Sequence, residues 1–283
     1  MDTQALIALL NRDLADEHAA ILRYLAHSYL EGEDTPLGAG LLSRCREEMW
    51  HMHWLGMIIG QLGGEPDMTP GPYPFDPTNR DTIFASYVAY EEKLIPHYLA
   101  EADQADDPHI RRVLQRESWE SEMHAKKFAR TRKKLSPELA AGLPGGENEL
   151  PAAFLESLQQ AVSRKYTQML QTIRDAWVLQ KDGMMGWRIM DFSFTKMKQL
   201  AHVAEDVAEN GITPRFTAGP LNKSAAIGTA LAHLTESLTA TRDGHMALQN
   251  DPEAQKHAGL LLNLDLSIRQ EEYEIAEIRD WKK

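Results

Sequence analysis

An acidic residue lies at the middle of the apolar stripe of each of four expected helices in the first half of the sequence. These four residues are Glu17, Glu48, Glu91 and Glu120. His51 follows Glu48 by three positions, and His124 follows Glu120 by four. Residues three or four apart share one face of a helix, so each pair would present a carboxylate and an imidazole together. Burying four carboxylates is very unfavourable unless a cation compensates them, so the pattern predicts a metal site.

Four carboxylates and two imidazoles on four helices are the ligand set of a dinuclear iron or manganese site in a bundle core. Mixed oxygen and nitrogen ligands suit these metals, whereas the absence of thiolates disfavours structural zinc. The expected cofactor is therefore two Fe ions, with Mn or a mixed Mn/Fe pair as alternatives. Two choices of ligand stay open. Glu92 adjoins Glu91, which is preferred because it shares the stripe of Tyr87 and Leu94, and Glu117 also lies on the inner stripe of its helix.

The elements that position these residues are helices. Apolar residues recur at three- and four-residue spacing and no segment alternates with period two, so the expected fold class is all-α. Helices are expected at about 3–32, 37–63, 80–105 and 108–135. The Pro- and Gly-rich segment 65–79 predicts a long crossover loop, which with short hairpins fits a four-helix bundle. Pro96, inside the third helix, predicts a kink or a widened turn.

The helical pattern repeats after a linker at 136–150. Helices are expected at about 151–181, 184–210, 222–249 and 251–281. At one common offset, Gly63, Pro66, Thr69, Gly71 and Pro72 match Gly211, Pro214, Thr217, Gly219 and Pro220. Five matches in register favour a tandem duplication. We expect two domains, 1–136 and 150–283, packed as a pseudo-dimer.

The second half is expected to lack the metal site. At the loop offset, Glu48 becomes Lys196, His51 becomes Gln199, and Glu17 becomes Lys165 or Tyr166. On the last helix, the apolar stripe His257, Leu261, Leu264 and Ile268 stands where the first half has Val113, Glu117, Glu120 and His124. Glu91 and Glu92 map near Thr235 and Glu236. Glu271 and Glu274 are interpreted as a solvated face.

The first half resembles the ferritin-like superfamily, in particular bacterioferritin and rubrerythrin, over residues 3–135. The family pattern is Glu on helix one, ExxH on helix two, Glu on helix three and ExxH on helix four. It is matched by Glu17, by Glu48-Met49-Trp50-His51 and by Glu91 or Glu92. The fourth helix departs, because Ser121 stands three before His124 and Glu120 stands four before. If both Glu120 and His124 bind metal, we expect a one-residue bulge there or monodentate Glu120, with Ser121 at the edge of the site.

The resemblance implies two tandem ferritin-like bundles and a di-iron (or Mn/Fe) carboxylate oxidoreductase that reacts with O2 or peroxide. Ferroxidase or peroxidase chemistry, or oxidation of a small organic substrate, would need no catalytic residue beyond the metal ligands. Rubrerythrin carries a CxxC electron-transfer module, whereas this sequence has one cysteine, Cys45. Electrons would come from an external donor, from substrate or from Fe(II). The alternatives are an iron-storage cage, which a fused pair fits badly, and a non-catalytic metal-binding or iron-handling protein.

Composition narrows the partners further. The 283 residues carry a net charge of −12, with 42 acidic against 30 basic residues, so nucleic acid is not expected as a partner. No apolar run of about 18 residues and no signal peptide occur, which predicts a cytoplasmic protein without a membrane span. A homo-oligomer beyond the internal pseudo-dimer stays open.

Overall fold

The computed structural model describes residues 2–73, 79–142, 150–181 and 183–281. Within these ranges it contains helices and no strands, which confirms the all-α fold class. The chain divides into two compact units, Met1–Pro144 and Gly145–Lys283, and each is described by itself. The boundary falls in the expected linker, of which 143–149 lie outside the described residues. None of the described helices has the length and apolarity needed to cross a bilayer.

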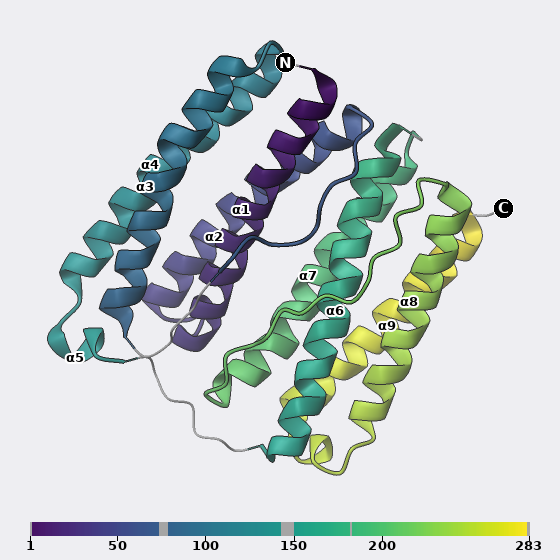
Figure 1. Cartoon of the computed structure of the whole chain (residues 1–283). Coiled ribbons are helices and arrows are strands. Elements are labelled where there is room, and N and C mark those ends of the chain that lie inside the picture. Colours follow the sequence, from purple (N-terminus) through teal and green to yellow (C-terminus); the bar gives the residue numbers. More distant parts are fainter. Residues whose placement is uncertain (1, 74–78, 143–149, 182, 282–283) are drawn as a thin grey trace. The chain divides into compact units, whose positions relative to one another are not determined.

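The first unit is built from α1 (Thr3–Glu31), α2 (Pro36–Gln61), α3 (Arg80–Gln104) and α4 (Pro108–Lys134), followed by the short α5 (Pro137–Ala140). Helix α1 packs beside α2, and α3 packs beside α4 (Figure 1). The four long helices lie where the apolar spacing predicts them. Each begins at a side chain that caps its first turn, namely Asp2, Thr35, Asn79 and Asp107.

The crossover from α2 to α3 runs over α1 (Figure 1), and α1 side chains hold it there. Asn11 donates to the carbonyl of Glu65 at 3.1 Å and accepts from the amide of Asp67 at 2.7 Å. Arg23 donates to the carbonyl of Pro72 at 3.2 Å. The described part of the predicted loop is therefore ordered by specific bonds, and residues 74–78 lie outside the described residues.

Two helices of the first unit were expected to be irregular. Helix α3 remains α-helical on both sides of Pro96, without a widened turn, and the alternative of a kink stays a prediction. Helix α4 likewise runs from Pro108 to Lys134 without a bulge. Both helices therefore present their inner faces at regular α-helical spacing.

The second unit contains α6 (Ala152–Val178), α7 (Met185–Glu209), α8 (Ile227–Gln249) and α9 (Ala258–Trp281), with 3₁₀ turns η1 (Leu179–Lys181) and η2 (Ala254–Lys256). Helix α9 starts later than expected because η2 occupies the predicted first turn. Gln159 bonds the amide and carbonyl of Arg215 at 3.0 and 2.7 Å, as Asn11 bonds the crossover of the first unit. Asn11 and Gln159 differ by 148 positions, as Gly63 and Gly211 do. This recurrence is what a tandem duplication predicts.

Gly38 lies in the first turn of α2, against the backbone of Gly32 at the end of α1. A Cβ there would come 2.0 Å from the carbonyl oxygen of Gly32, whereas a Cβ at Gly40 meets nothing within 4 Å. We predict that Gly38→Ala lowers the free energy of unfolding by about 2 kcal/mol through overpacking. Gly40→Ala, the matched control on the same helix, should raise it by about 1 kcal/mol. Denaturant unfolding of both variants checks this; equal effects would mean that the hairpin contact is unimportant.

Candidate metal centre

Five of the six predicted ligands lie together inside the first unit. They are Glu17 on α1, Glu48 and His51 on α2, Glu91 on α3 and His124 on α4, and each is at most 1% exposed. Glu92 is exposed, so the residue of that pair that faces the interior is Glu91. The apolar stripe decided this choice correctly, because Tyr87 and Leu94 are buried on the same face.

The first group consists of Glu17, Glu48 and His51. Oxygen Oε2 of Glu17 lies 3.2 Å from Nδ1 of His51, and Oε2 of Glu48 lies 2.9 Å from the same nitrogen. One ligand atom from each of these residues lies within 4.8 Å of the others. Two carboxylates and one imidazole therefore converge on a volume suited to a single cation.

The second group consists of Glu48, Glu91 and His124. Nitrogen Nδ1 of His124 lies 2.7 Å from Oε1 of Glu48 and 3.5 Å from Oε1 of Glu91. One ligand atom from each of the three residues lies within 4.8 Å of the others. Glu48 thus belongs to both groups, with one oxygen turned toward each histidine. A carboxylate placed in this way can bridge two metal ions.

Glu120 is the predicted ligand that the structure does not bring into either group. Its Oε2 lies 2.6 Å from Nε2 of His51, the ring nitrogen that faces away from Glu17 and Glu48, and its other oxygen accepts a hydrogen bond from Arg116 at 2.9 Å. Glu120 thus lies on the outer side of His51 and outside both groups, and its expected role as a ligand stays a prediction. A metal-binding histidine usually donates its second ring N–H to a carboxylate, which fixes the ring and its tautomer.

Glu47 plays the corresponding part for the other histidine and was missed by the sequence analysis. Its Oε2 lies 2.5 Å from Nε2 of His124 and 2.6 Å from Arg44. The Nε2 atom of each imidazole thus contacts a carboxylate of the other helix. His51 of α2 contacts Glu120 of α4, and His124 of α4 contacts Glu47 of α2. The signal in the sequence was an Arg three or four residues before each of these acids.

Helix α4 carries a buried carboxylate, Glu117, that belongs to neither group. Ser121, at the usual ligand position, is 1% exposed. Glu117, one turn earlier, is completely buried, and neither of its oxygens has a hydrogen-bond partner. The charges that act on Glu117 include those of His51 and Glu17. Glu117, kept open as an alternate ligand, is therefore a buried acid beside the first group without a compensating partner of its own.

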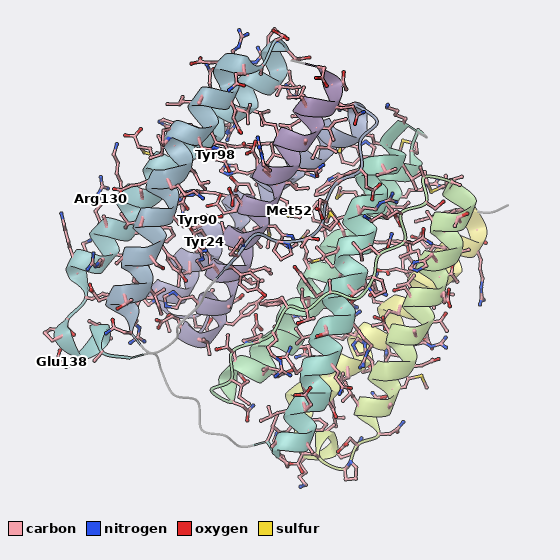
Figure 2. The ribbon with its side chains drawn as sticks, viewed as in Figure 1. Tyr24, Met52, Tyr90, Tyr98, Arg130 and Glu138 are labelled. Atoms are coloured by element: carbon pink, nitrogen blue, oxygen red, sulfur yellow. The ribbon has the colours of Figure 1, made fainter. Side chains whose placement is uncertain are left out.

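Two tyrosines labelled in Figure 2 hold the remaining carboxylates. Tyr24 of α1 donates to Oε1 of Glu91 at 2.5 Å, and Tyr98 of α3 donates to Oε1 of Glu17. Both rings are fully buried. Each phenol orients a carboxylate from the helix pair opposite its own, so the two ends of the centre are fixed independently.

Burial and mutual charge interactions shift the pKa values of the groups at this centre. Burial raises the pKa of Glu17 to about 8. Burial alone would lower the pKa of His51 and His124, but the surrounding carboxylates raise that of His51 well above its usual range and that of His124 to about 12. Metal binding would therefore compete with protons for these imidazole nitrogens. Burial raises the pKa of Glu117 well above its usual range.

This donor set fits two transition-metal ions. Oxygen and imidazole donors converge on two adjacent positions, with a shared carboxylate between them and orphaned buried oxygens at Glu117. The donors are the types that Fe and Mn favour in bundle cores. Glu17 and His51 would hold one ion, Glu91 and His124 the other, and Glu48 both.

In the second unit, lysines stand at the corresponding positions. Lys165 and Lys196, at the places of Glu17 and Glu48, are completely buried, and Lys165 donates to Gln199 at 2.6 Å. Lys165 pairs with Glu271, and Lys196 pairs with Glu274. The interpretation of Glu271 and Glu274 as a solvated face was wrong, since both are completely buried.

The error came from the alignment of the last helix. The sequence pattern had aligned Val113 with His257 and His124 with Ile268, an offset of 144 residues. The buried positions of α4 instead recur in α9 after 150 residues, so that Ser121 corresponds to Glu271 and His124 to Glu274. The buried positions of α3 recur in α8 after 147 residues, so that Glu91 corresponds to Leu238 and not to Thr235. In this unit the ammonium groups of Lys165 on α6 and Lys196 on α7 thus provide the positive charge beside the buried carboxylates.

We predict that Lys165→Met destabilises the second unit by about 3 kcal/mol, because it removes the ammonium partner of the buried Glu271 and leaves that carboxylate only His245, at 3.4 Å. The double variant Lys165→Met, Glu271→Leu should recover most of that loss, since an apolar pair needs no compensation. Thermal and denaturant unfolding of the three proteins checks this. A double variant as unstable as the single one would show that the ion pair itself, rather than charge balance, stabilises the core.

Comparison with known proteins bears on the first unit. Residues 7–136 match the family model described as ferritin-like domain. A search of curated proteins and a search of solved structures each gave no match. The matched residues contain helices α2 to α4, all of α1 from Ile7 onward, and both ligand groups. The match assigns residues 7–136 to a ferritin-like domain.

Proposed function

We propose that the first unit is a di-iron, Mn or mixed Mn/Fe carboxylate oxidoreductase that uses O2 or peroxide. The observation that carries the proposal is the sharing of Glu48 between two complete carboxylate–imidazole groups, each buried. A site with a single structural cation would not need the second group. Iron bound there supplies Fe(II)/Fe(III) redox chemistry.

The protein's own residues would hold and orient this centre. Tyr24 and Tyr98 fix the carboxylates of Glu91 and Glu17, and Glu47 and Glu120 fix the two imidazoles. Because all ligands are buried, bulk water is kept from the centre. We propose that the electrons for this chemistry come from Fe(II), from a small substrate or from an external donor.

Glu117 supports a further assignment within this centre. Its buried oxygens lack hydrogen-bond partners, and Ser121 provides no carboxylate where the family pattern has one. We propose that Glu117 supplies the carboxylate of α4 at the first metal position. Glu120 then acts only on the outer nitrogen of His51.

A non-catalytic metal-binding or iron-handling protein is the second candidate. The same buried groups favour it, since a cation would relieve their charge whether or not it turns over. Aerobic addition of Fe(II) to the metal-free protein separates the two. Rapid, repeated Fe(II) oxidation with O2 uptake supports the enzyme, whereas binding without oxidation supports the second candidate.

Glu48→Gln tests the shared ligand. Because the amide carries no charge and its nitrogen cannot ligate, we expect loss of both metal ions and at least a hundredfold fall in Fe(II) oxidation rate. Glu92→Gln, an exposed acid on α3, is the control and should change neither. Metal analysis and oxygen uptake provide the readouts; a Glu48→Gln protein that retains one ion would show two independent sites instead.

Glu117→Gln tests the replacement of the missing carboxylate. If Glu117 binds metal, its amide should lower the affinity for the first ion by about 10- to 100-fold. Ser121→Ala should leave the affinity unchanged. Competition with a chelator measures both. Unaltered affinity in Glu117→Gln, together with higher stability of the metal-free protein, would identify Glu117 as a buried acid outside the metal shell.

A further inference from the structure

A third cluster of metal-binding groups lies in the first unit and shares no residue with the two groups described above. It consists of Asp13 on α1 with His97 and Glu101 on α3. Nitrogen Nε2 of His97 lies 3.3 Å from Oδ1 of Asp13 and 3.1 Å from Oε1 of Glu101. One donor atom of each residue lies within 4.8 Å of the others, so the three donors face a common point.

The two acids of this cluster are buried and share the half-exposed imidazole of His97 as their nearest cationic partner. Asp13 is completely buried, with its Oδ1 facing His97. Glu101 is 5% exposed, and its Oε2 lacks a hydrogen bond. The guanidinium of Arg12 lies 3.8 Å from the other oxygen of Glu101, but its side chain is mostly exposed, so it compensates little. Burial, together with the charge of Asp13, raises the pKa of Glu101 to about 8.

The second unit shows that such a bundle does not need charges here. Ala161 and Leu248 occupy the positions that correspond to Asp13 and Glu101, and both are buried. Asp13 and Glu101 therefore place carboxyl groups where the second unit has apolar side chains. Burying them is unfavourable for desolvation, and a bound cation would offset that free energy.

The cluster is also reachable from solvent. The side chain of His97 is 40% exposed, whereas all five buried ligands of the dinuclear centre are at most 1% exposed. Asp13 precedes Glu17 by four residues on α1, so the cluster lies about one turn, roughly 6 Å along the helix, from the first ligand group.

We propose that Asp13, His97 and Glu101 form a third cation site, for a single divalent transition-metal ion. An imidazole with two carboxylates suits Fe(II), Mn(II), Co(II) or Zn(II), and the nitrogen donor disfavours Mg²⁺ and Ca²⁺. The half-exposed histidine leaves room for water to complete the coordination. The site rests on its own three residues and does not depend on the proposed oxidoreductase activity.

The test is equilibrium dialysis of the full chain with Co²⁺, followed by metal analysis. We expect His97→Ala to lose one equivalent of bound Co²⁺ relative to the wild type, and Asp13→Asn to lose the same equivalent. Asp103→Asn removes an exposed acid near Glu101 and serves as the control, which should keep wild-type stoichiometry. His97 lies at the surface, so its truncation should leave folding intact, as circular dichroism would show.

The same measurement on a Glu48→Ala, His51→Ala background separates the two proposals. This protein should retain one equivalent of Co²⁺, and adding His97→Ala should remove it. Failure of the dinuclear proposal would appear as equal stoichiometry with and without Glu48 and His51. Failure of the third site would appear as equal stoichiometry in His97→Ala, Asp13→Asn and the Asp103→Asn control.

Discussion

Compensation of buried charge at the middle of each bundle is the constraint on which the rest of this structure depends. Four helices bring acidic side chains to a common interior, where an unpaired carboxylate costs several kcal/mol. The first unit gathers Glu17, Glu48 and Glu91 around two imidazoles and leaves Glu117 without a partner. The capped helices, the anchored crossover and the regular α4 all serve to hold these groups at close range.

The second unit meets the same constraint with its own side chains. Lys165 and Lys196 replace two of the acids, and Glu271 and Glu274 pair with them in a fully buried network. Charge is thus balanced within the chain by ion pairs, whereas the buried groups of the first unit are arranged as two carboxylate–imidazole sets.

The sequence predicted the helices and most of the buried groups because an apolar stripe at helical spacing identifies one face. It resolved Glu91 from Glu92, which point about 100° apart. It did not reveal that Glu120 lies on the outer side of His51, since a residue at the border of the stripe can point to the inner or the outer side of a neighbouring ring. It misread Glu271 because the last helix was aligned with α4 at 144 residues instead of 150, and spacing within one helix does not reveal such a shift.

The most direct test of the central claim is a crystal structure of protein purified with iron or manganese, with anomalous scattering recorded at the metal edge. The structure described above predicts two peaks a few Å apart in the first unit, both within bonding distance of Glu48, and no peak between Lys165 and Lys196. A single peak, or peaks away from Glu48, would contradict the assignment of a shared dinuclear centre. A peak at the lysines of the second unit would contradict the view that ammonium groups replace the cations there.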